Sequence, residues 1–199
     1  MAAPKTDRRE RIVQSALTCF VKAGVAQTRM ADIAAHAKVD QPLIGYYFPT
    51  PESLYAEVVG RVLNDLKDDS IAGIERGGTD PKKIMTYYVR APFEWGEKKP
   101  GYFSIWMYFY YLASYQPAFI ELNKTIRQNG RDRIAFIIYS GIEKGAFSMP
   151  DGMTVAQAAL AIQGIITGIG IMAGSEGPKV WKSFADEAVR TVLALLRAN

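Results

Sequence analysis

The sequence has few of the residues that form cross-links or hold metals. It contains one cysteine, Cys19, and one histidine, His36, among 199 residues. A single cysteine cannot form an internal disulfide, which is typical of a protein in a reducing compartment. Cys19 falls on the apolar face of the first expected helix, so we expect a buried structural thiol. His36 has no cysteine or carboxylate cluster beside it, so we expect an exposed side chain and no metal site.

Catalytic patterns and targeting signals are also missing from the sequence. There is no nucleophile motif, no metal-ligand spacing and no glycine-rich loop that would hold a phosphate. The first residues are polar and charged, with no apolar run after them, so we expect a cytoplasmic protein without a signal peptide. We therefore expect a protein that is not an enzyme and needs no cofactor.

Only one apolar run is long enough to raise the question of a membrane span. Residues 153–173 carry no charge, and Gly164 and Gly168 have the spacing that lets two helices approach closely. However, Gln157 and Gln163 interrupt the run, and no basic cluster flanks it. We therefore expect a helix at a subunit interface and no contact with a membrane.

What is present is an almost continuous helical pattern, which predicts an all-α fold. Apolar residues recur at helical spacing, and Gly, Pro and capping residues separate the segments. The expected helices are residues 6–23, 28–38, a short helix after Asp40, 52–74, 82–98, 101–114, 117–145, 155–173 and 179–197. We expect the Asp40 carboxylate to cap the third helix, with Pro42 tolerated in its first turn. The predicted domains are residues 1–50 and 51–199, with the fourth helix forming a rod shared by both parts.

Positive charge is concentrated in the first of these domains. Residues 1–50 carry +3 of the formal net charge of +4. Such a surface suits DNA, whose phosphates supply much of the binding affinity and make it salt-dependent. Residues 28–48 predict two short helices joined by a tight turn, the pattern of a helix-turn-helix whose second helix enters the major groove. The alternative for Arg8, Arg9 and Arg11 is a solvated face without a role in DNA binding.

Residues 12–20, 28–37 and 39–54 resemble the N-terminal domain of the tetracycline-repressor (TetR) family of bacterial transcription regulators. The resemblance implies a three-helix DNA-binding domain joined to a helical domain that binds an effector and forms a dimer. The residues expected at DNA are Thr28, Arg29, Lys38, Gln41, Pro42, Leu43, Gly45, Tyr46 and Tyr47.

The resemblance also implies a role for each part of this set. Gln41, Pro42 and Leu43 would face the base edges, the two tyrosines would lie near phosphates, and Thr28 and Arg29 would hold flanking phosphates. The chemistry agrees, because glutamine can pair with adenine and an apolar side chain can contact the thymine methyl group. A tyrosine hydroxyl is an ordinary phosphate donor. The alternative for the aromatics of this segment is a core position, which we expect for Phe48.

Three positions depart from the family pattern. Gly45 stands where the family often has an aromatic residue, and Pro51 stands where it usually has a lysine. Lys38 replaces the usual glycine of the turn and adds a positive charge. These departures bear on the strength and sequence of the operator, and not on the fold.

Aromatic residues cluster in the middle of the chain, where 13 of the 23 aromatics lie between residues 87 and 119. Two helical faces of aromatics exceed what one core seam needs, so we expect a ligand cavity, with Glu94 or Glu97 orienting the guest. Aromatic rings with a carboxylate could also hold an organic cation. The alternative is a filled aromatic core. The expected effector-binding residues are Phe93, Tyr102, Phe103, Trp106 and Tyr110.

The last two helices carry apolar stripes that predict a dimer interface. Two helices from each subunit would form a four-helix bundle about a two-fold axis. Part of each stripe must also serve the core of the chain itself. The expected interface residues are Ile162, Ile166, Ile169, Trp181, Phe184, Ala188 and Val192.

Together these features predict a homodimeric transcriptional regulator, most often a repressor in this family. It would bind a palindromic double-stranded operator and be released by a small apolar or aromatic effector. Two alternatives remain open. One is a DNA-binding dimer without an effector, and the other is a ligand-binding or scaffold protein whose head no longer reads DNA, for which Gly45 and Pro51 are the support.

Overall fold

The structure is a computed structural model that describes residues 5–198, and every regular element in this range is a helix. The all-α prediction is therefore confirmed, and the expected helices differ from the observed ones by no more than three residues at either end. The helices are α1 (Lys5–Ala23), α2 (Met30–Ala37), α3 (Gln41–Tyr47), α4 (Pro51–Gly77), α5 (Pro81–Lys98), α6 (Pro100–Leu112), α7 (Pro117–Glu143), α8 (Val155–Glu176) and α9 (Trp181–Leu195).

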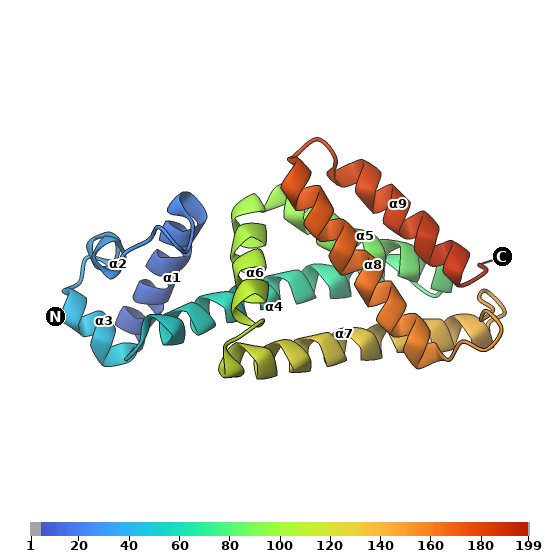
Figure 1. Cartoon of the computed structure of the whole chain (residues 1–199), viewed down its shortest axis with the longest axis horizontal. Coiled ribbons are helices and arrows are strands. Elements are labelled where there is room, and N and C mark those ends of the chain that lie inside the picture. Colours follow the sequence, from blue (N-terminus) through green and yellow to red (C-terminus); the bar gives the residue numbers. More distant parts are fainter. Residues whose placement is uncertain (1–4, 199) are drawn as a thin grey trace.

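Helices α1 to α3 gather at one end of the molecule and form what we call the head (Figure 1). Ile12, Ile33 and Phe48, from α1, from α2 and from just after α3, are all buried in one core. Because these side chains recur on one face of each short helix, burying them fixes the angle between the helices. Cys19 is half-buried in this core, and burial raises the pKa of its thiol. His36 is exposed, as predicted.

Asp40 occupies the N-cap position of α3, but the predicted capping hydrogen bond is wrong. The Asp40 carboxylate accepts no hydrogen bond from the first turn. The reason is local: Pro42 has no N–H to donate, and the Leu43 N–H donates to the Asp40 backbone carbonyl instead, at 3.0 Å.

Helix α4 runs from the head into the rest of the molecule, which we call the body (Figure 1). Its start is fixed by Thr50, whose side-chain oxygen accepts from the Ser53 N–H at 3.2 Å. On the head side, the two terminal guanidinium nitrogens of Arg61 donate to the carboxylate of Glu10 on α1, at 2.5 and 2.6 Å. The division of the chain at residue 50 stays a prediction, since one buried cluster extends from the head into the body.

The body is a bundle in which α5 is central and packs against α4, α7, α8 and α9. Two close approaches depend on glycine. A Cβ on Gly96 of α5 would lie 2.5 Å from the ring of Trp181 on α9, and a Cβ on Gly174 of α8 would lie 2.1 Å from the Phe103 ring on α6. Helix α8 packs between α7 and α9 and has one side open to solvent (Figure 1).

Candidate DNA-binding helix and ligand cavity

Helix α3 has one face exposed and the opposite face buried in the head. Gln41, Pro42 and Gly45 are exposed, and Leu43 is half-buried. Ile44, on the opposite face, is buried against the head core. A seven-residue helix with one buried anchor presents its N-terminal residues at the surface, which is where a recognition helix contacts base edges.

The two tyrosines at the end of α3 differ in exposure. Tyr46 is 66% exposed, while Tyr47 is half-buried and packs against the head core. Their rings meet edge to face with centroids 5.3 Å apart. Most of the Tyr46 ring therefore stays at the surface of the head. Phe48 is buried, as predicted.

Two of the groups expected at a DNA phosphate, the Thr28 hydroxyl and the Arg29 backbone N–H, form hydrogen bonds within the protein at the start of α2. The Thr28 hydroxyl donates to the Gly24 carbonyl at 2.8 Å and so closes the turn. The Arg29 backbone N–H donates to the Asp32 carboxylate at 2.9 Å, and this bond fixes the start of the helix. The Arg29 side chain itself is exposed. The Arg29 side chain therefore stays at the surface, where its phosphate contact remains a prediction, while the Thr28 side chain is engaged in the turn.

Lys38 ends α2 in the left-handed conformation, with φ of 52°. Its N–H closes the helix by donating to the Ala35 carbonyl at 3.2 Å. A lysine in this conformation costs about 1 kcal/mol relative to the glycine that turns of this kind favour. The exposed ammonium group lies at the turn before α3, where it adds positive charge to the same surface.

The first-helix arginines have different surroundings. Arg9 forms an ion pair with Glu57 of α4, and its guanidinium lies over the Phe48 ring, 5.0 Å from the centroid. Arg11 is exposed. Arg9 therefore joins the head to α4, a role that neither the DNA-binding nor the solvated-face interpretation anticipated.

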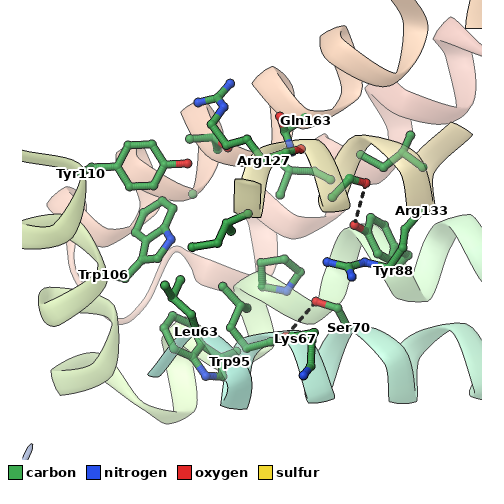
Figure 2. A pocket seen from close by; sticks show the side chains of 18 of the residues that line it. Leu63, Lys67, Ser70, Tyr88, Trp95, Trp106, Tyr110, Arg127, Arg133 and Gln163 are labelled. Carbon is green, nitrogen blue, oxygen red and sulfur yellow. Dashed lines mark hydrogen bonds between the residues drawn. The ribbon is translucent and has the colours of Figure 1, made fainter. Parts of the chain in front are cut away.

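A cavity of about 150 Å³ lies in the body among α4, α5, α6, α7 and α8 (Figure 2). One end is apolar and aromatic, with Trp95, Trp106 and Tyr110 on its walls. The other end is polar, with Tyr88, Arg133 and Gln163 on its walls. This arrangement of an apolar space with a few polar groups is typical of a small-molecule site.

Three of the five predicted effector residues lie on this cavity. Phe103, Trp106 and Tyr110 form a continuous aromatic wall along α6. The ring centroids of Phe103 and Trp106 are 5.2 Å apart, and those of Trp106 and Tyr110 are 4.5 Å apart. Phe93 is not on the wall but is fully buried in the core. Tyr102 is not on the wall either and packs against Trp95 and beneath the Lys99 ammonium, 5.7 Å from its ring centroid.

The aromatic end of the cavity is positioned by Asp65 of α4. Its carboxylate accepts from the Trp95 indole N–H at 2.7 Å and from the Lys99 ammonium at 2.6 and 2.8 Å. These bonds join α4, α5 and the start of α6 at one point, and the hydrogen bond to Asp65 raises the pKa of Lys99. Trp95 is thereby held in one orientation on the cavity wall.

Sequence reasoning missed the cations of the cavity wall, which are Arg127 and Arg133 of α7 and Lys67 of α4. Figure 2 shows Arg133 beside Tyr88 and Arg127 on the side of Tyr110. The expected carboxylates are elsewhere. Glu94 lies 3.7 Å from Arg76 and 3.9 Å from Lys98 on the outside of α5, and Glu97 is exposed. The helical period of α7 places Arg127 on the same face as buried Ile134, but it does not indicate that this face borders a cavity.

Most of the predicted dimer stripe belongs to the core of the chain itself, and the interface prediction is corrected for four residues. Ile162, Trp181, Ala188 and Val192 are buried against α5 and neighbouring helices and have no surface left for a partner. Ile166, Ile169 and Phe184 are half-buried, and Ile166 lines the cavity. The exposed face of α8 is formed by different residues, which are Ala156, Leu160, Gly164, Gly168 and Met172.

Comparison with known proteins agrees with the geometry of the head. Residues 12–58 match the family described as "Bacterial regulatory proteins, tetR family". The chain is 24% identical over 174 residues to the HTH-type transcriptional regulator BetI 1 of Chromohalobacter salexigens, covering 79% of this chain and 82% of that protein. It is 21% identical over 117 residues to the BetI of Stenotrophomonas maltophilia, covering 59% of this chain and 60% of that protein.

Solved structures share the whole fold. A TetR transcription regulator from Haloarcula marismortui matches with a TM-score of 0.80 at 20% identity, covering 96% of this chain and 97% of that one. A transcriptional regulator from Saccharomonospora viridis, solved in complex with choline, matches with a TM-score of 0.80 at 19% identity, covering 98% of both chains. At these identities the likeness concerns the arrangement of the helices.

Proposed function

Because this chain is a TetR-family transcriptional regulator, we propose that it acts as a homodimeric repressor with a small-molecule effector. Two copies of α3 would enter successive major grooves of a palindromic operator, about 34–36 Å apart for half-sites one helical turn apart. An apolar or aromatic effector would enter the body cavity and release the DNA. The protein would act in the cytoplasm, where its operator is.

The observation that carries this proposal is that α6 contacts both the cavity and the head. Phe103 and Trp106 of α6 form the cavity wall. The start of the same helix packs on α1, since a Cβ on Gly101 would lie 2.6 Å from Val21. A buried hydrogen bond of 2.7 Å from the Tyr55 hydroxyl to the Ile105 carbonyl joins α6 to α4.

This arrangement gives an effector a physical route to the DNA-binding helices. A guest that displaces α6 would change its contacts with α1, which is part of the head, and with α4, which joins the head to the body. The effector can shift the equilibrium only through its differential affinity for the DNA-bound and released conformations. A guest that binds both conformations equally would change nothing.

Helix α8 supports the dimer. By length and composition it is apolar enough to cross a membrane, because its most apolar 18-residue stretch has a mean hydropathy of 1.7. Only 28% of that stretch is buried within the chain. Leu160 and Met172 are each about half exposed on its open side. A second copy of the same helix would cover this face, and Gly164 and Gly168 would let the two backbones approach closely.

The test is a footprint on the DNA that flanks the protein's own gene, run across a salt series. The proposal expects a protected palindrome that persists at physiological salt. Diffuse protection that fades as salt rises would contradict operator binding at that site and favour a head that no longer reads sequence.

The effector part is tested with Trp106→Ala. Removing the indole enlarges the cavity and removes part of its aromatic wall, so we expect the response to effector to fall at least about tenfold while operator affinity changes less than twofold. Titration of the protected operator with effector measures both quantities. Equal effector response in the variant and the original chain would exclude this cavity as the effector site.

A further inference from the structure

The charges on the cavity wall indicate which kind of ligand the cavity would bind, which its volume alone does not. Among the described residues that line it, the charged side chains are Lys67, Arg127 and Arg133, and none is a carboxylate. Lys67 lies 3.7 Å from Asp68 at the surface. The ion pairs formed within residues 5–198 include neither of the two arginines. The charged groups on the cavity wall are therefore all positive, and its two arginines form no ion pair within the described residues.

Arg133 is the best placed of these cations to meet a guest. Figure 2 shows its guanidinium group reaching from α7 between Tyr88 and Ser70 toward the cavity. Its Nε atom is buried and has no hydrogen-bond partner in the described part of the chain. Burial raises the pKa of the Tyr88 hydroxyl, and the hydrogen bond with Arg133 and the positive charge of that side chain oppose the rise. Arg133 as a residue is half-buried. Leaving its buried Nε–H without an acceptor is costly, and a bound anion would supply that acceptor.

The rest of the cavity limits the body of the guest. Trp106 and Tyr110 lie across the cavity from Arg133, with Leu63 beside the aromatic end (Figure 2). A volume of about 150 Å³ holds about one benzene-sized ring. The guest that fits both ends has a compact apolar body and one negative group.

We propose that the cavity binds a small carboxylic acid as its anion, with the carboxylate on Arg133 and the apolar body against Trp106 and Tyr110. The proposal rests on the effector role of the cavity and names the chemistry of that effector. A carboxylate matches the fork of a guanidinium group with two parallel hydrogen bonds. An organic cation such as choline is disfavoured by the same charges, since Glu94 and Glu97 lie off the wall.

The first test compares ligands on the unaltered chain by calorimetry and thermal unfolding. The probes are phenylacetate, its uncharged analogue phenylacetamide, hexanoate and choline. We expect phenylacetate to bind at least about tenfold more tightly than phenylacetamide, because the amide keeps the shape and loses the charge. Hexanoate, tested beside phenylacetate, decides whether the apolar end prefers a ring or a chain. Equal affinity for acid and amide would overturn the proposal.

The second test uses Arg133→Gln with Lys124→Gln as the matched control. Lys124 is an exposed cation on the same helix that does not line the cavity. We expect R133Q to reduce phenylacetate affinity at least about tenfold and to leave phenylacetamide affinity unchanged within about twofold, while K124Q changes neither. Equal losses in the two variants would mean a general field effect and contradict a direct contact. If R133Q does not fold, the comparison of acid with amide still decides the question.

The outcomes separate this inference from the proposed function. Choline or phenylacetamide binding more tightly than the acids, and releasing the operator, would overturn the anion and leave the effector role of the cavity intact. Release of the operator by phenylacetate in the original chain but not in W106A would support both. No binding by any of the four probes would overturn the anion inference as stated.

Discussion

Gln41 is the exposed residue at the start of α3 whose side chain can distinguish one base from another. A glutamine that pairs with adenine contributes about 1–3 kcal/mol of discrimination against a wrong base. We expect Gln41→Ala to abolish the preference for the operator over unrelated DNA while the salt-dependent affinity for unrelated DNA remains. Binding titrations on both DNAs at two salt concentrations measure this. Gln14→Ala, on an exposed part of α1, is the control, and equal losses on both DNAs in Q41A would show that Gln41 does not read bases.

Gly45 and Gly96 are both helical glycines, and they differ in the space around them. A Cβ on Gly45 meets no atom within 4 Å, while a Cβ on Gly96 would lie 2.5 Å from the Trp181 ring. We expect Gly45→Ala to raise the free energy of unfolding by about 0.5–1 kcal/mol through helix propensity. We expect Gly96→Ala to lower it by about 1–3 kcal/mol through overpacking. Urea unfolding of both variants compares them, and a destabilising G45A would contradict the open surroundings.

The Glu10–Arg61 ion pair is one of the contacts between α1 and α4. Hydrogen bonding to Arg61 lowers the pKa of Glu10. A carboxylate with a lowered folded-state pKa stabilises the fold above its unfolded pKa, and this contribution is lost as the pH falls through the folded value. Because the pair is largely exposed, we expect no more than about 1 kcal/mol at neutral pH. Unfolding of the original chain and of Glu10→Gln from pH 7 to 3 should give curves that converge at acid pH, and a constant offset would contradict the ion pair.

The elements themselves could be predicted from the sequence because their signals are local. Apolar spacing and breakers such as Gly78 and Pro100 act within a few residues, so the helices were placed almost correctly. The walls of the cavity could not be predicted in the same way. Tyr102 and Trp106 share a face of α6 by helical period, yet Tyr102 packs against Lys99 because Asp65, distant in sequence, holds that lysine in place. Arg133 joins the cavity through the packing of α7, which no local pattern specifies.

For the molecule as a whole, the dimer can be tested without disturbing the subunit. A Cβ on Gly168 of α8 meets no atom within 4 Å, and the same is true of Gly60 of α4. We expect Gly168→Leu to fold at least as well as the original chain, because leucine favours helix, but to remain monomeric because its side chain blocks the partner helix. Light scattering gives the mass, with Gly60→Leu as the control. A dimeric G168L would place the interface on another face.

Which apolar residues lie in the core of the chain and which stay exposed depends on how all the helices pack, so it could not be predicted from the sequence. Trp181 and Leu160 are both apolar residues of the last two helices, but one fills the space beside Gly96 and the other is half exposed. Helical period predicts which residues share a face. It does not predict which face the other helices of the same chain cover.

Helix α4 also sets a mechanical scale for regulation. At about 1.5 Å per residue, its 27 residues form a lever about 40 Å long that reaches from the head into the body. A tilt of about 5° at the body end would move the other end by about 3.5 Å. In the proposed dimer, this movement in both subunits would sum to about a fifth of the spacing between half-sites. In the proposed dimer, a guest the size of one ring would need to turn α4 by only a few degrees to move the two α3 helices out of register with the operator.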